Sequence, residues 1–156
     1  MATSITFDLI DRLVDVFKAG DLPDTVRVVD GDVVSGDAGT YLAVGWEDPD
    51  SDRSTSSTGQ QTWNGLGARS RRESGSVTCL ALSWNGNSNG LRQARTAVKE
   101  VTDAVENLLR TDPNLGGAVP GLLWTSYGTR TDLKQWLSEE GSVATCTFEI
   151  AFEAKI

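Results

Sequence analysis

Histidine is absent from this sequence of 156 residues, and cysteine occurs only twice. Without histidine, the chain lacks the usual general base of serine and cysteine hydrolases and the commonest side-chain ligand of metal ions. Cys79 and Cys146 lie within runs of alternating apolar residues, where a free cysteine behaves as a small hydrophobic side chain. We therefore predict two buried free thiols, with a disulfide between them as the alternative.

Long apolar runs and an excess of positive charge are also missing. No stretch approaches the roughly 20 apolar residues that a membrane-spanning helix needs, so no membrane segment is expected. Residues 1–4 lack a basic region followed by an apolar one, which predicts no secretory signal and synthesis in the cytoplasm. The net charge of −8 argues against nucleic acid as the main bound partner, because phosphate binding needs a basic face.

The clearest pattern in the sequence lies at its end, in residues 142–156. Successive side chains of a strand point to opposite faces, and here every even position is apolar while most odd positions are polar. This alternation predicts a long strand in an antiparallel sheet that has one covered face. The apolar positions are Ala144, Cys146, Phe148, Ile150, Phe152, Ala154 and Ile156.

Two segments have the periodicity of amphipathic helices. Residues 4–19 place their apolar residues on one side at helical spacing, and residues 91–110 repeat theirs at alternating steps of three and four. Ser4 is the predicted cap of the first helix, and Ser88 or Asn89 of the second. Both helices are expected to lie on the sheet.

Further strands complete the predicted fold. A hairpin turn at residues 30–31 is expected to join the first two strands, and a turn at 139–141 to lead into the last. Residues 132–138 also fit a short helix, but a strand is favoured. All five tryptophans fall in predicted strands, as their β propensity suggests. The strands are expected at residues 25–29, 32–34, 40–46, 61–66, 75–84, 122–127 and 132–138.

The sequence therefore predicts a single α+β domain over residues 1–156. Its sheet is antiparallel or mixed, with five or more strands, and two helices pack on it. Residues 47–61 are rich in Asp, Ser and Thr and hold no large apolar side chain, so we expect them to form a mobile loop.

This loop opens with residues 48–52, an Asp-Pro-Asp-Ser-Asp run that resembles the beginning of a calcium-binding loop. An EF-hand needs Gly at the sixth position and Glu at the twelfth, where this chain has Arg53 and Gly59. No metal site is predicted, although weak cation binding remains an alternative to a solvated loop.

Residues 86–90 match the Gly-x-Ser-x-Gly motif of hydrolases, between a predicted strand and a predicted helix. Ser88 has no histidine to accept its proton, and the chain's lysines lie on predicted polar faces. We therefore predict a turn rather than a nucleophile, no enzyme activity, and no cofactor.

Charged residues provide the candidates for contact with a partner. Arginines at 69–72 form the densest basic cluster of an acidic chain and would suit an acidic partner surface, with a solvated turn as the alternative. The other candidates are acidic side chains, which lie in the predicted loop and on the polar face of the last strand. The partner-interface candidates are Arg69, Arg71, Arg72, Asp50, Asp52 and Glu149.

The order of these elements resembles the tail terminator proteins of long-tailed (siphovirus) phages, of the lambda-type group. That order is an amphipathic helix, short strands, a long loop, a strong strand, one long helix, and a C-terminal hairpin. The likeness is strongest over residues 76–156, above all at 91–109 and 144–156, while the first seventy residues match in outline.

The resemblance implies a structural virion protein located at the junction of tail and head. Six subunits would form a ring that caps the tail tube, stops tube polymerisation, and offers its other face to the head–tail connector protein. DNA would pass through the lumen without specific binding, consistent with an acidic subunit. A head–tail connector or tail tube subunit is the nearest alternative, and a small α+β enzyme or ligand-binding domain is a more distant one.

Overall fold

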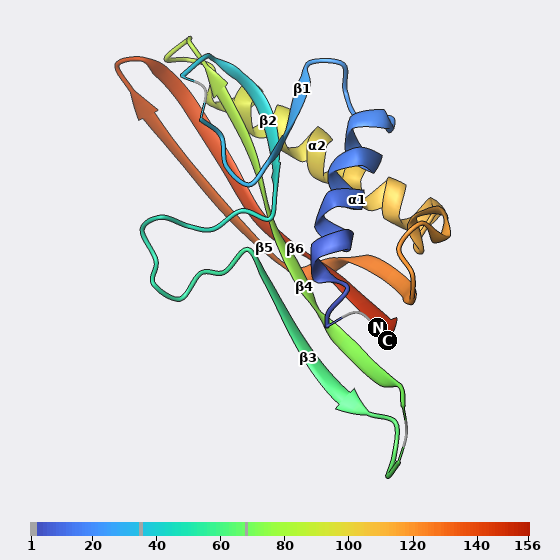
Figure 1. The fold of residues 1–156 in the computed structure, drawn as a ribbon. Helices are drawn as coiled ribbons and strands as arrows, with labels where there is room; N and C mark the ends of the chain where they lie inside the picture. Colours follow the sequence, from blue (N-terminus) through green and yellow to red (C-terminus); the bar gives the residue numbers. More distant parts are fainter. Residues whose placement is uncertain (1–2, 35, 68) are drawn as a thin grey trace.

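Two helices cover one face of a six-stranded mixed sheet within the part of the chain that the computed structural model describes (Figure 1). This arrangement confirms the predicted α+β fold. The described residues are 3–34, 36–67 and 69–156; part of the segment searched for a secretory signal lies outside them. The elements are α1 (Thr6–Ala19), β1 (Val26–Asp30), β2 (Gly39–Val44), β3 (Ser57–Trp63), β4 (Arg71–Asn85), α2 (Leu91–Thr111), the 3-10 turn η1 (Leu115–Gly117), β5 (Leu122–Ser138) and β6 (Gly141–Lys155).

The long strands β4 and β6 form the centre of the sheet, whose order is β1-β2-β4-β6-β5. β4 and β6 are antiparallel, with Val77 opposite Ile150. On its other side, β4 pairs with β3 along its first half and with β2 along its second half. The predicted interior position of residues 75–84 and the predicted C-terminal hairpin are both confirmed.

The predicted hairpin at residues 30–31 is wrong, because β1 and β2 run parallel. Gly31 adopts a φ of +88°, and its N–H donates to the carbonyl of Val44 at the end of β2. The chain must therefore return to the other end of the sheet before β2 begins. Residues 32–34 belong to this connection and form no strand. Trp46 likewise lies just beyond β2, outside the strands, whereas the other four tryptophans lie within them.

The predicted loop over residues 47–61 is partly wrong, because residues 57–61 belong to strand β3. Apart from Gly59 and Trp63 its residues are polar, and its backbone pairs with β4 over seven positions. The two backbones come so close that a Cβ on Gly75 would lie 1.9 Å from the carbonyl oxygen of Thr58. Residues 47–56 do form a loop, and their mobility stays a prediction. β5 is one long strand with bulges where two strands were predicted.

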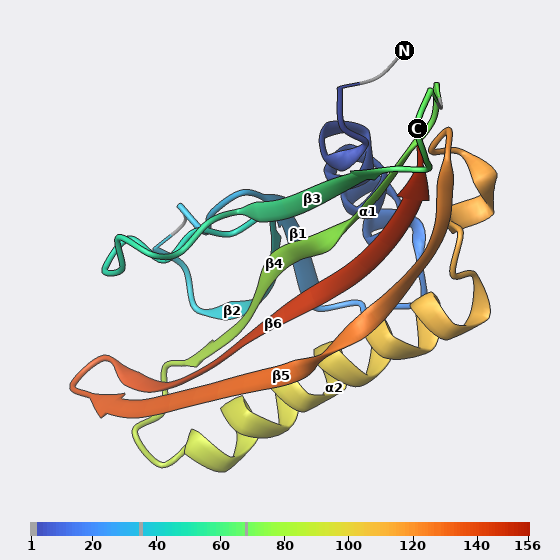
Figure 2. The ribbon, with the colours of Figure 1, turned by 90° about the horizontal axis from the view of Figure 1, so that it is seen from below.

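The hydrophobic core lies between the helices and the sheet. α2 runs along β4, β5 and β6, while α1 contacts β1 and β2 (Figure 2). The even positions of β6 from 144 to 154 are all buried, as their alternation predicted. Cys79 and Cys146 are buried and free, which confirms the predicted thiols. Burial raises the pKa of Cys79 to about 12 and also raises the pKa of Cys146.

The helix starts differ in part from those predicted, because Ile5 rather than Ser4 takes the cap position of α1, although the Ser4 hydroxyl accepts a hydrogen bond from the backbone N–H of Thr6 at 3.1 Å. α1 begins after Ile5, whose N–H donates to Oε2 of Glu73 at 3.1 Å, and the Ser4 hydroxyl donates to the same carboxylate. The buried carboxylate of Glu73 on β4 thus accepts a backbone hydrogen bond that the first turn of α1 cannot make within the helix. α2 begins after Gly90 without a side-chain cap, so neither Ser88 nor Asn89 takes that role.

Candidate interaction surfaces

The face of the sheet opposite the helices carries an apolar depression of about 720 Å³, here called the tryptophan groove. Leu80, Leu82 and Trp84 point to this face because they alternate with the core residues of β4. Trp84 and Trp136 stand on either side of Val143 in the register of β4, β6 and β5. The groove is lined by Tyr41, Trp46, Leu80, Leu82, Trp84, Trp136 and Val143, among others.

Acidic side chains form most of the charged rim of this groove. Lys134 is the one cation among the described lining residues, against five carboxylates. One of the five, Asp37, lies beside the guanidinium of Arg27, so its charge is partly balanced. The groove is therefore an apolar surface in a negative field, which favours an apolar partner that carries positive charge. The acidic rim residues are Asp32, Asp37, Asp48, Asp50 and Glu140.

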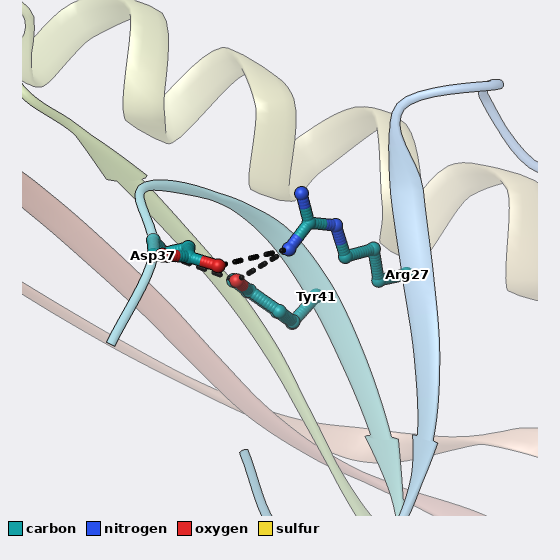
Figure 3. A network of polar contacts seen from close by, with 3 residues as sticks. All are labelled: Arg27, Asp37 and Tyr41. Atoms are coloured by element: carbon teal, nitrogen blue, oxygen red, sulfur yellow. Dashed lines mark hydrogen bonds and ion pairs between the residues drawn. The ribbon is translucent and has the colours of Figure 1, made fainter. Parts of the chain in front are cut away.

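A polar network holds the edge of the groove in place (Figure 3). Arg27 Nη1 donates to the hydroxyl of Tyr41 at 3.2 Å and lies 3.9 Å from Oδ2 of Asp37. The Tyr41 hydroxyl in turn donates to the backbone carbonyl of Asp37 at 2.9 Å. These contacts join β1, β2 and the connection between them, so the Tyr41 ring is fixed in the groove wall.

A second, more polar depression of about 980 Å³ adjoins the tryptophan groove and shares lining residues with it. Charges of both signs line it, including Glu149, which is exposed, and an Arg130–Asp132 ion pair with Nε and Oδ2 2.8 Å apart. Its balanced charge gives it less preference for a partner of one sign than the groove has.

The turn between β3 and β4 forms the third surface, here called the hairpin tip: residues 63–67 and 69–71. It extends well beyond the body of the molecule (Figure 1). Trp63 is 65% exposed, and Leu66 is fully exposed. Arg71 donates from Nη1 to Oε1 of Gln61 at 2.8 Å, and its guanidinium lies 5.3 Å from the centre of the Trp63 ring. The exposed Arg69 completes an apolar and basic tip.

The predicted partner-interface candidates fall into two groups. Arg69 lies in the turn before β4, and Arg71 and Arg72 begin that strand, where Arg72 forms an ion pair with Glu153 at 3.0 Å. Asp50 lines the groove and Glu149 lines the polar depression, so these two share one face of the sheet. Asp52 is exposed in the same loop as Asp50 but lines neither depression.

The groove itself was not predicted from the sequence, although a signal for it was present. Residues 75–84 are apolar on both faces, which indicated an interior strand. It also indicated that the second face of the sheet carries an apolar surface. Which tryptophans gather there depends on the register between strands, and the sequence does not contain that register.

Residues 86–90, which match the Gly-x-Ser-x-Gly motif, form a turn. Ser88 is exposed in the loop before α2, where the side chains of Asn85 and Asn87 each accept a hydrogen bond from a backbone N–H two residues on. Among the described residues, no three His, Cys, Asp or Glu side chains gather as they would around a metal ion. In the same residues, no helix has the length and apolar character to cross a membrane.

Comparison with known proteins adds no assignment: no protein-family model matches the chain, and no curated protein matches its sequence. The resemblance to tail terminators therefore stays a prediction. Function has to be inferred from the groove, the polar depression and the hairpin tip.

Proposed function

We propose that the protein is a structural subunit of a phage virion, a tail terminator that forms a ring of six on the end of the completed tail tube. The observation that carries the proposal is the asymmetry of the sheet. Helices cover one face, whereas the other face presents the tryptophan groove, and a basic, apolar hairpin tip extends from the far end. Exposed apolar side chains that gather at such surfaces are typical of sites where proteins bind one another.

Ring formation needs two different surfaces on each subunit that bind one another head to tail. The molecule supplies several candidates, because β1 and β5 end the sheet and β3 pairs with β4 on one side only. Exposed sheet edges hold backbone donors and acceptors that can pair with another chain. A net charge of −8 per subunit would make the lumen repel DNA, as a passage for DNA requires.

A connector or tail tube subunit would use similar surfaces, so the mode of assembly separates these alternatives. A tube subunit adds without limit, a terminator stops growth, and a connector binds on the side of the head. A ligand-binding domain is the second candidate function, because about 720 Å³ of aromatic-lined groove lies in the size range of small-molecule sites.

The test is to add the purified protein to growing tail tubes and to image the tube ends by electron microscopy. We expect a closed ring at the tube end, no further growth, and a bound mass of six times the 16.7 kDa subunit. Free subunits are allowed to remain monomeric, because a terminator must not assemble before the tube is complete. Open filaments, or a stable dimer with no ring on the tube end, would refute the proposal.

A further inference from the structure

We propose that the tryptophan groove of one subunit receives the hairpin tip of the next subunit in the ring. This inference rests on the proposed function, because it assigns the contact by which the ring closes. Each subunit would then use its tip on one side and its groove on the other.

The apolar parts of the two surfaces suit one another. Trp63 and Leu66 are exposed on the tip, and the structure places no described core residue over either of them. In the groove, Trp136 is 47% exposed, and Trp84, on the other side of Val143, is half-buried. Contact would remove all four side chains from water, and tryptophan is enriched among the residues that contribute most to interfaces.

The charges of the two surfaces are opposite. Residues 57–72 contain three arginines and no acidic residue, whereas the groove rim holds five carboxylates and Lys134. Within their own subunit, Arg71 contacts Gln61 and Arg72 contacts Glu153. The exposed Arg69 is therefore the cation that the tip presents most directly. Complementary charge of this kind fixes the orientation of partners and speeds their encounter.

The position of the two surfaces requires a second copy of the chain. The tip leads into β4 at Arg71, whereas Leu82 and Trp84 reach the groove at the other end of the same strand. That length of strand separates them by about 40 Å, so a tip cannot enter its own groove. Figure 1 shows the hairpin extending away from the rest of the sheet. A tip that binds the groove of another copy makes a head-to-tail contact, which can close into a ring.

Disulfide trapping in the full-length protein tests this contact and captures it even where the affinity is low. Leu66→Cys places a thiol on the tip, and Ser138→Cys places one on the groove lining. The native cysteines are buried, so they should not compete. Mixing the two single variants under mild oxidation should give a crossed dimer. The double variant should give a ladder of linked species that ends at a closed six.

Two controls separate the contact from random collision and from misfolding. Leu66→Cys mixed with Glu100→Cys, which is exposed on α2, should give at least tenfold less crossed dimer. Arg69→Glu in the tip variant should lower the yield by a similar factor, and Asp50→Arg in the groove variant should restore it. Arg92→Glu, also exposed on α2, should leave the yield unchanged.

The outcomes distinguish this inference from the proposed function. Equal yields for Ser138→Cys and Glu100→Cys, or no effect of Arg69→Glu, would overturn the contact. Rings of six on tube ends without tip–groove crosslinks would also overturn it while leaving the terminator function in place. Tip–groove crosslinks that build only open chains would support the contact and refute the ring.

Discussion

At the scale of single residues, Glu73 has the most unusual position, because it is a carboxylate on the helix-covered face of the sheet and only 1% exposed. Its oxygens accept hydrogen bonds from the backbone of Ile5 and the hydroxyl of Ser4 at the start of α1. Strand β4 and helix α1 are thereby joined by polar contacts within an apolar layer. A buried donor left without its acceptor is destabilising, so this contact should be visible in stability measurements.

Replacing Glu73 with Ala should lower the free energy of unfolding by about 2–3 kcal/mol, because the Ile5 N–H would lose its acceptor. Glu73→Gln should cost less, since its amide oxygen can still accept that hydrogen bond. Urea denaturation monitored by circular dichroism measures both changes. Equal losses for the two variants would contradict the capping role.

Phe148 is 1% exposed and stacks on Tyr127 with ring centres 4.9 Å apart. Phe148→Ala should therefore lower the free energy of unfolding by about 3–5 kcal/mol, the range for large core residues that leave a cavity. The adjacent Glu149→Ala is the control, because its side chain is exposed on the opposite face and its loss should leave the fold intact. Chemical denaturation of both variants is the measurement.

Because of Cys79, the stability of the fold should depend on pH in the alkaline range. Burial raises the pKa of Cys79 to about 12 in the folded protein from the ordinary thiol value of 9.0, so the unfolded chain loses the proton first as pH rises. The protonated Cys79 thiol makes its full contribution to the free energy of unfolding below pH 9. As pH rises towards 12 that contribution is lost, and the free energy of unfolding falls by about 1.4 kcal/mol per pH unit. Cys79→Ala should reduce that slope between pH 9 and 12 in denaturation curves. A residual slope is expected, because burial raises the pKa of Cys146 as well.

At the scale of elements, β3 and the preceding loop should differ in stability from β4 and β6. Residues 47–55 make local contacts, such as Asp48 N–H to the Ser54 hydroxyl at 2.9 Å, and Ser56 accepts a hydrogen bond from Thr78, whereas β4 is paired on both sides. We expect rapid hydrogen exchange across 47–56 in the free subunit, slower exchange in β3, and the slowest in β4 and β6. Strong protection of 47–56 in the monomer would show that the loop is ordered before assembly.

At the scale of the whole molecule, the covered face of the sheet accounts for folding and the open face for the proposed assembly. Trp136 contributes to the open face and is 47% exposed, so Trp136→Ala should leave the thermal midpoint nearly unchanged. The same substitution should lower the occupancy of tube ends at a given subunit concentration. Trp124→Ala is the matched control, because Trp124 is 39% exposed near the other end of β5, where it donates to Glu153. Equal effects of the two substitutions on occupancy would argue against a contact at the groove.

The sequence by itself determined the elements whose evidence is local. The alternation of residues 144–154 and the periodicity of residues 91–110 each record which side of one element faces the core, so β6 and α2 were predicted almost to their ends. The burial of Cys79 and Cys146 followed from the same patterns.

Only the tertiary structure decided which strand lies beside which. The parallel pairing of β1 with β2 depends on backbone hydrogen bonds between residues that are separated in sequence. The mostly polar strand β3 joins the sheet through its backbone pairing with β4. The tryptophan groove arises for the same reason, because only the register of β4, β6 and β5 places Trp84 and Trp136 on either side of Val143. A residue pattern records the face of its own element, whereas a surface made by several strands exists only once they have paired.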